Sequence, residues 1–221
     1  MLKDIRGVFL DMDGTLLNTL DDICDAVNET LTHWGLENRT QAELIQFIGF
    51  GAKHLCRGAT GFEDDARLEA FHQAYRQNAL LREDPKTEPY AGMPELVAHL
   101  RDKGVRVGIY TNKPQAWTEK LAARYFGENA FDGIYGVHAG GVLKPSAAGI
   151  VEMCGRWGIA CRDTVMVGDS PVDIETAHLA GVPGIGCTWG FRPREALVAA
   201  GADFLVDSAS ELRALLDGVK P

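Results

Sequence analysis

Short runs of mainly apolar residues recur along the chain, and helical patterns separate most of them. Most of the runs are four to six residues long, which is the length of a strand. They are too apolar for strands with one face in water and are typical of parallel strands that are buried on both faces. The alternation of strand and helix predicts a doubly wound, Rossmann-like α/β fold with a parallel sheet. The runs cover residues 5–10, 105–110, 133–137, 164–167, 183–187 and 204–206.

One long segment interrupts this alternation. Residues 18–84 show helical patterns but no convincing strand, and residues 83–90 form a polar, proline-containing return linker. We therefore expect a small α-helical cap domain at 18–84, inserted into an α/β core made of residues 1–17 and 85–221. Thr40, with Glu43 three residues later, predicts a capping box in this segment. A helical bundle inserted here would lie over the carboxyl end of the first strand, where open α/β sheets bind their ligands.

The charge of the chain argues against one class of partner. The sequence has 22 Lys and Arg against 31 Asp and Glu, which gives a formal net charge of −9. Proteins that bind nucleic acid usually carry a basic patch, so we expect no nucleic-acid partner. Any phosphate group that binds here must be met by a few local cations, either Lys and Arg side chains or a metal ion.

The cysteines and the N-terminus bear on the location of the protein. The five cysteines are widely spaced and form no CxxC pair, a pattern typical of free thiols in a reducing compartment. There is no cleavable signal pattern, and no uncharged apolar run approaches the roughly 20 residues that span a bilayer. We expect a cytoplasmic monomer or homodimer with no membrane partner.

Acid, hydroxyl and amide side chains follow three of the predicted strands. Taken alone, each cluster is also typical of ordinary turns and helix caps. In a doubly wound sheet, however, the carboxyl ends of all the parallel strands lie at one edge, so we expect the clusters to meet there. They are Asp11 and Asp13 with Gly14 and Thr15, then Thr111 and Asn112, and finally Asp169 and Asp173.

Acids gathered at one edge repel each other unless a cation lies among them. Ligand sets made only of oxygen atoms favour a hard ion, and Mg²⁺ fits best. Lys144 adds one local positive charge, although a lysine in an exposed loop is normally solvated. A carboxylate nucleophile, a metal ion, a hydroxyl and a lysine together suit phosphoryl transfer, in which catalysis is mostly positioning and charge neutralisation.

Four sequence pieces resemble the ordered motifs of the haloacid dehalogenase superfamily of phosphohydrolases. They are Asp11-x-Asp13-Gly14-Thr15, Thr111, Lys144-Pro145 and Gly168-Asp169-Ser170-x-x-Asp173. The resemblance spans the whole chain and includes a helical cap inserted after the first motif. Within the superfamily, the segments DGTLLNT and GDSPVDIETAHLAGV most resemble the phosphoglycolate phosphatases. One departure is KPSA, where the family commonly has a second proline two residues after the first.

The resemblance implies catalytic roles for the matching residues. Asp11 would attack the phosphorus to form an aspartyl-phosphate, and Asp13 would protonate the leaving oxygen and then deprotonate the attacking water. Thr111 and the amide of Asn112 would bind phosphoryl oxygens, and Lys144 would neutralise charge between Asp11 and the phosphate.

The resemblance also implies a Mg²⁺ site and further substrate contacts. Mg²⁺ would be held by the carboxylates of Asp11 and Asp169 and the backbone carbonyl of Asp13, with Asp173 in support. Gly14 and Thr15 would belong to the substrate site.

The cap is expected to select the leaving group. Residues 48–53 resemble the family's substrate-facing loop, and Lys53 and Arg57 are candidate partners for a substrate carboxylate. Both could equally be solvated helix charges. The implied partner is a small phosphorylated metabolite, with 2-phosphoglycolate as the first candidate. A sugar-phosphate phosphatase or phosphomutase of the same superfamily, and a non-catalytic interaction protein that retains the fold, remain as alternatives.

Overall fold

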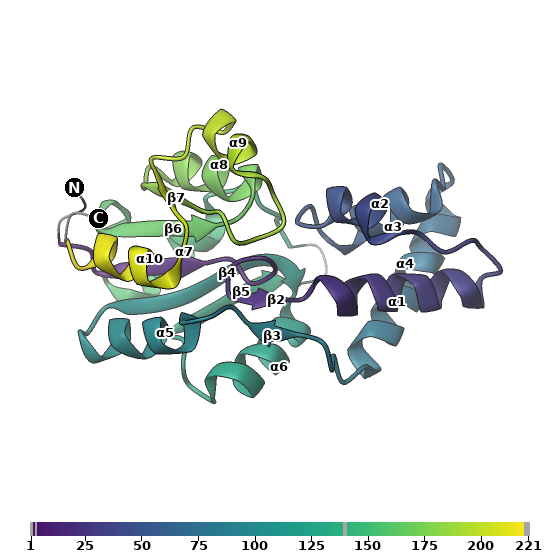
Figure 1. Cartoon of the computed structure of the whole chain (residues 1–221), viewed down its shortest axis with the longest axis horizontal. Helices are drawn as coiled ribbons and strands as arrows, with labels where there is room; N and C mark the ends of the chain where they lie inside the picture. Colours follow the sequence, from purple (N-terminus) through teal and green to yellow (C-terminus); the bar gives the residue numbers. More distant parts are fainter. Residues whose placement is uncertain (1, 3, 139–140, 219–221) are drawn as a thin grey trace.

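The computed structural model describes residues 2, 4–138 and 141–218. A six-stranded sheet with the order β5-β4-β1-β6-β7-β8 forms the middle layer of the larger part of the molecule (Figure 1). All of its neighbouring strands are parallel, which confirms the predicted doubly wound α/β fold. The strands are β1 (Gly7–Leu10), β4 (Arg106–Pro114), β5 (Gly133–Val137), β6 (Thr164–Gly168), β7 (Gly184–Cys187) and β8 (Phe204–Val206).

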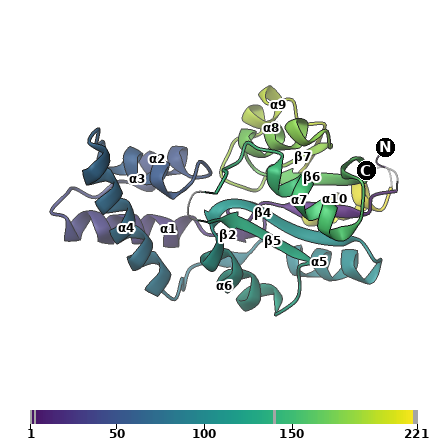
Figure 2. The ribbon, with the colours of Figure 1, turned by 180° about the vertical axis from the view of Figure 1, so that it is seen from behind.

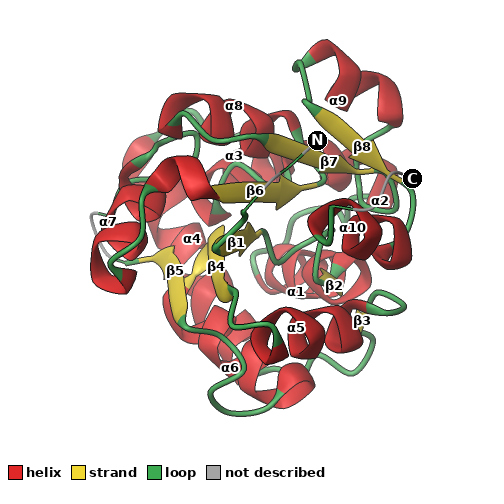
Figure 3. Cartoon of the chain, turned by 90° about the vertical axis from the view of Figure 1, so that its left-hand side faces the viewer, coloured by secondary structure: helices red, strands yellow, loops and turns green. Residues whose placement is uncertain are grey.

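Helices cover both faces of this sheet (Figure 3). Successive side chains of a strand point to opposite faces, so Val8 and Leu10 of β1 join one core and Phe9 joins the other. No helix in the described ranges has the length and apolar character needed to cross a membrane. The first face is covered by α5 (Met93–Asp102), α6 (Gln115–Phe126) and α10 (Ala209–Leu216), and the second by α7 (Ala148–Trp157) and α8 (Pro171–Ala180). The chain also forms α9 (Arg194–Ala199) and a 3-10 turn, η2 (Cys161–Asp163).

Four further helices, α1 to α4, form a separate group at one end of the sheet (Figures 1 and 2). This helical group has a hydrophobic cluster of its own, centred on buried residues such as Leu31 and Phe71, and Trp117 of α6 also packs into it. The capping box predicted at Thr40 and Glu43 is present. The elements are α1 (Leu20–His33), α2 (Gln41–Leu44) with the 3-10 turn η1 (Ile45–Phe47), α3 (Ala52–Thr60) and α4 (Asp65–Leu81).

Two features of the strands differ from the sequence-based expectation. The segments that enter and leave the helical group pair as a short antiparallel ribbon of β2 (Leu17–Asn18) and β3 (Glu88–Pro89). Two residues are too few to show a strand periodicity, which is why the ribbon was not predicted. In addition, β4 continues four residues beyond Tyr110, and its register with β5 shifts between Tyr110 and Pro114. Thr111 and Asn112 therefore lie within a strand.

Candidate active site

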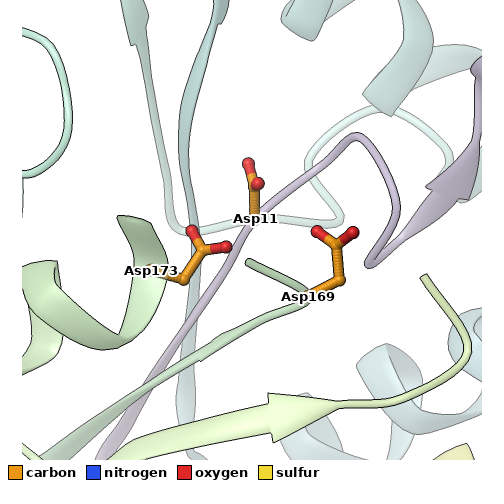
Figure 4. A group of neighbouring side chains, drawn as sticks. All are labelled: Asp11, Asp169 and Asp173. Carbon is orange, nitrogen blue, oxygen red and sulfur yellow. The ribbon is translucent and has the colours of Figure 1, made fainter. Parts of the chain in front are cut away.

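Three carboxylates meet at the carboxyl edge of the sheet (Figure 4). Asp11 follows β1, Asp169 follows β6, and Asp173 lies in the first turn of α8. Each offers an oxygen within 4.8 Å of an oxygen of the other two, and all three residues are buried. The structure brings these predicted residues together because β1 and β6 are direct parallel neighbours whose ends lie side by side.

The ammonium group of Lys144 lies between two of these acids. Its Nζ is 2.9 Å from Oδ1 of Asp11 and 2.6 Å from Oδ1 of Asp173, and the side chain is 1% exposed. Burial by itself lowers the pKa of a lysine, but the attraction of Asp11 and Asp173 outweighs burial and raises the pKa of Lys144 above its usual value. Lys144 is therefore a buried, charged counter-ion and not a solvated loop residue.

Burial and mutual repulsion make the acids harder to ionise. Burial is the main reason why the pKa of Asp11 is raised to about 6; Lys144 opposes this shift and Asp173 adds to it. Burial, followed by repulsion from Asp173 and Asp11, raises the pKa of Asp169 well above its usual range. Three ionised carboxylates and one ammonium leave a formal charge of −2, which a divalent cation would balance. The oxygen-only ligand set fits a hard divalent ion.

A small cavity lies between these acids and the helical group. The space open to the centres of water-sized molecules is about 40 Å³. The cavity is polar on the side of the sheet and mostly apolar on the opposite side. Asp11, Asp13, Thr111, Asn112, Lys113 and Pro114 form the first side, and Ile23, Ile48, Gly49, Gly51, Ala52, Leu55, Tyr75 and Trp117 complete the lining.

Two donors hold the carboxylate of Asp13 at this cavity. Oγ1 of Thr19 and Nζ of Lys113 both donate to Oδ1 of Asp13, at 2.7 and 2.8 Å. The side chain of Lys113 is only 8% exposed, so the ion pair is largely shielded from water. In the described part of the chain no donor is assigned to Oδ2 of Asp13, which leaves that oxygen available for proton exchange with a bound group.

Thr111 and Asn112, both predicted to bind phosphoryl oxygens, have different surroundings. The hydroxyl of Thr111 is buried, and its interaction with Asp11 lowers the pKa of that carboxyl against the larger effect of burial. The side-chain amide of Asn112 instead donates to the carbonyls of Gly49 and Lys144, at 2.9 and 3.0 Å, and accepts from the Lys144 N–H at 2.7 Å. These contacts use both amide hydrogens. The side chain of Asn112 therefore connects the segment at Gly49 to the segment at Lys144.

Gly14 and Thr15, predicted to contact substrate, lie against Asp169 instead. Gly14 has a φ of 82°, and a Cβ atom there would lie 2.3 Å from Oδ2 of Asp169. Oγ1 of the fully buried Thr15 donates to Oδ1 of Asp169 at 3.5 Å, and the Phe191 N–H donates to Oδ2 at 2.7 Å. Neither Gly14 nor Thr15 is among the described residues that line the cavity. Both therefore support a carboxylate of the acidic cluster.

Asp173 is oriented in a similar way by its neighbours. The N–H and Oγ of Ser170 donate to Oδ2 of Asp173 at 3.1 and 2.6 Å, which leaves Oδ1 for Lys144. A Cβ atom at Gly168 would lie 2.1 Å from Cγ of Asp173, so only glycine lets the carboxylate approach the strand end this closely.

The structure does not bring Lys53 and Arg57 to the cavity. Nζ of Lys53 lies 3.0 Å from Glu69, and a guanidinium nitrogen of Arg57 lies 2.8 Å from Asp65. Both basic side chains are close to half exposed. In this conformation Lys53 and Arg57 form surface ion pairs. They match the alternative expectation that both are solvated helix charges.

Two core side chains hold one segment of the helical group over the cavity. Arg192, in the loop after β7, donates from its two terminal nitrogens to the carbonyls of Ile45 and Ile48, each at 2.7 Å. Asn112 donates to the next carbonyl, that of Gly49. Residues 45–49 are therefore attached to the core at two points.

Comparison with known proteins identifies the family. The family model described as haloacid dehalogenase-like hydrolase matches residues 8–187. The chain belongs to this family. A haloacid dehalogenase-like relative from Yersinia pestis, named phosphoglycolate phosphatase, is 30% identical over 218 residues, which are 95% of this chain and 92% of the relative. A relative of the same name from Rhodospirillum rubrum is 32% identical, over 94% of this chain and 89% of its own length.

Solved structures of haloacid dehalogenase-like proteins share the fold. One from Lactobacillus delbrueckii, described provisionally as a phosphoglycolate phosphatase, superposes with a TM-score of 0.87 at 26% identity. The match covers 96% of this chain and 98% of that one. The chain is therefore an enzyme, a phosphatase of the haloacid dehalogenase-like family.

Sequence reasoning missed two residues of this haloacid dehalogenase-like site, Lys113 and Thr19. A signal for Lys113 was present, because it directly follows Thr111 and Asn112 at the carboxyl end of the predicted strand. Thr19 stands six residues after Asp13, and no periodic pattern connects the two. Its contact arises from the turn that returns the chain to β2.

Proposed function

We propose that this phosphatase hydrolyses a small phosphomonoester, with 2-phosphoglycolate as the first candidate, through an aspartyl-phosphate on Asp11. One observation carries the proposal: Asp11 and Asp13 line the same cavity. A phosphate ester bound there can meet a carboxylate nucleophile and, on its leaving oxygen, a carboxylic acid. The names of the relatives from Y. pestis and R. rubrum support the choice of substrate.

In the first step, a carboxylate oxygen of Asp11 attacks the phosphorus. The bond between phosphorus and the ester oxygen breaks, its electron pair stays on that oxygen, and the oxygen takes the proton that Asp13 carries on Oδ2 at the start of the cycle. A dianionic phosphate and Asp11 repel each other by about 4 kcal/mol per pair of unit charges at 4 Å and an effective dielectric of 20. The ammonium of Lys144, 2.9 Å from Asp11, offsets part of this repulsion.

In the second step, water releases the phosphate. Asp13, now a carboxylate, takes a proton from water while the water oxygen attacks the phosphorus, and the bond between phosphorus and Asp11 breaks. Inorganic phosphate leaves and Asp11 is restored. Asp13 serves first as acid and then as base, and the contacts of Thr19 and Lys113 to its Oδ1 keep it directed at the same point in both steps.

We also propose Mg²⁺ as the cofactor. Asp11, Asp169 and Asp173 would hold the ion with the backbone carbonyl of Asp13. The buried oxygen ligands and the charge of −2 in this cluster support a divalent ion. When bound, the ion supplies charge neutralisation between Asp11 and the phosphoryl group.

We infer that residues 18–84 act as a cap domain on a core of residues 1–17 and 85–221. The separate hydrophobic cluster of the helical group and the β2–β3 ribbon at its base support this division. The name phosphoglycolate phosphatase, carried by the relatives from Y. pestis and R. rubrum, supports a small leaving group. These names favour 2-phosphoglycolate over the sugar-phosphate and phosphomutase alternatives.

Two measurements test the proposal. Hydrolysis of p-nitrophenyl phosphate with Mg²⁺ should fall by about a thousandfold or more in Asp11→Asn, and an unchanged rate would contradict the nucleophile assignment. In a screen of small phosphate esters, 2-phosphoglycolate should give the highest kcat/KM. A sugar phosphate that is preferred by about tenfold would contradict the substrate assignment, since that ratio corresponds to about 1.4 kcal/mol of transition-state discrimination.

A further inference from the structure

The ammonium group of Lys113 is a cation at the cavity, and its role in the two chemical steps is limited to its contact with Asp13. Nζ of Lys113 lies 2.8 Å from Oδ1 of Asp13 and 5.8 Å from the centre of the Trp117 ring. Among the described residues that line the cavity, Lys113 is the only basic one. Lys144, the other lysine near the reacting groups, is already engaged by Asp11 and Asp173.

The surroundings of Lys113 limit what can bind beside it. The cavity wall opposite the sheet is formed largely by apolar side chains, including Ile23, Ile48 and Leu55. An anionic group that enters such a wall without a counter-ion pays a large desolvation cost. None of the described residues of the helical group that line the cavity is basic, and Lys53 and Arg57 form ion pairs at the surface.

The ammonium of Lys113 has the capacity for a second anionic partner. A lysine ammonium carries three N–H donors, and Asp13 accepts from one of them. The aromatic face of Trp117 lies within the range in which a ring attracts a cation, which helps to keep the ammonium at the cavity.

We propose that Lys113 is a specificity-determining residue that binds a negatively charged group, such as a carboxylate, on the leaving group of the substrate. This inference rests on the proposed phosphatase reaction and deepens it: the substrate class is a phosphomonoester whose leaving group is itself anionic. Since the same ammonium contacts Asp13, it holds the charged end of the leaving group beside the residue that protonates the leaving oxygen. A short leaving group, with the carboxylate one or two carbons from the ester oxygen, fits the 2.8 Å separation between Lys113 and Asp13.

A pair of matched substrates tests the inference. 2-Phosphoglycolate and 2-hydroxyethyl phosphate have leaving groups of similar size, but only the first has a charged one. We expect the wild-type protein to prefer phosphoglycolate in kcat/KM by at least about tenfold. Lys113→Met should lose about tenfold or more of this preference, and Lys113→Arg, which keeps the charge, should retain most of it.

The ratio is measured on a single preparation of each variant, so a partly unfolded fraction lowers both rates equally and cancels. Lys103→Met is the control for loss of a surface charge, because Lys103 is half exposed and pairs with Asp217; its ratio should equal that of the wild type. A wild-type ratio near one, or an equal loss on both substrates in Lys113→Met, overturns the inference while the phosphatase assignment stands. Full activity in Asp11→Asn would be a different result, and it would contradict the proposed function itself.

Discussion

The ammonium nitrogen of Lys144 lies 2.9 Å from Oδ1 of Asp11 in the interior of the protein, where neither side chain is more than 7% exposed. Removal of one member of this pair leaves the other charge buried without its counter-ion. Asp173, at 2.6 Å from the same nitrogen, would lose its counter-ion at the same time. The pair therefore affects both the stability of the protein and the reaction at Asp11.

Lys144→Met removes the charge but keeps much of the side-chain length. Breaking a buried ion pair costs about 3–5 kcal/mol, so urea unfolding should show a loss of that order. Turnover of p-nitrophenyl phosphate should fall by about a hundredfold or more, because the phosphate then approaches an unscreened Asp11. Lys103→Met, at the surface, should change neither quantity measurably. Wild-type turnover in Lys144→Met would show that the ammonium has no part in the reaction.

The raised pKa of Asp11 makes the stability of the metal-free protein depend on pH. The pKa of the Asp11 carboxyl is 3.8 in the unfolded chain and about 6 in the folded protein. Between these values the folded state binds more protons, so the free energy of unfolding falls as the pH rises from about 4 to about 6. Because the pKa of Asp169 is also raised, the free energy of unfolding continues to fall at higher pH.

Denaturant unfolding in EDTA across this pH range measures the effect. The contribution of Asp11 is the difference between the wild-type curve and that of Asp11→Asn, which cannot ionise at this position. Asp11→Asn should gain stability relative to the wild type as the pH rises. A constant difference between the two curves would contradict the assignment of the raised pKa.

Mg²⁺ should reverse the destabilisation at neutral pH. A ligand that binds only the folded state raises the free energy of unfolding by mass action, by about 2.7 kcal/mol at a hundred times its Kd. We expect the Tm to rise with Mg²⁺ concentration in the wild type and to respond much less in Asp169→Asn. Asp102→Asn, an exposed acid on α5, is the matched control and should respond as the wild type does. An equal response in Asp169→Asn would place the ion elsewhere.

Gly14 and Gly104 provide a test of close packing at the acidic cluster. Both have positive φ, 82° and 76°, but a Cβ at Gly14 would lie 2.3 Å from Asp169 whereas a Cβ at Gly104 would meet nothing within 4 Å. Each alanine variant should lose about 1–2 kcal/mol of stability from backbone strain. Only Gly14→Ala should also displace the Asp169 carboxylate and lose the Mg²⁺-dependent rise in Tm. A similar Mg²⁺ response in both variants would argue against this packing role.

Arg192→Ala should loosen the attachment of the helical group to the core. The variant loses the hydrogen bonds to the carbonyls of Ile45 and Ile48, which leaves Asn112 as the remaining tie to this segment. We expect a larger radius of gyration by small-angle X-ray scattering and a KM raised by about tenfold, equivalent to about 1.4 kcal/mol. Arg194→Ala is the control, because Arg194 is half exposed and pairs with Asp207. If both variants scatter like the wild type, Arg192 does not hold the group in place.

Much of the architecture was predictable because it depends on patterns that are local in the chain. Buried strands must be apolar on both faces, and parallel strands need helical crossovers, so the α/β alternation could be read along the sequence. The meeting of Asp11 with Asp169 also followed, since acids placed after parallel strands must lie at the same edge. The short β2–β3 ribbon and the extension of β4 past Tyr110 could not be read, because each depends on pairing with a distant segment.

The amino-acid sequence by itself determined the fold class, the family and which strand ends carry acids. Only the tertiary structure decided which partner each charged or polar side chain takes. It buried Lys144 between two acids, committed Asn112 to backbone carbonyls, turned Lys53 and Arg57 outward, and brought Lys113 to Asp13. The physical reason is the sequence distance over which each signal acts. Hydrophobic periodicity involves neighbouring residues, whereas an ion pair or hydrogen bond needs two groups within about 3 Å of each other, and folding brings these groups together from distant positions in the chain.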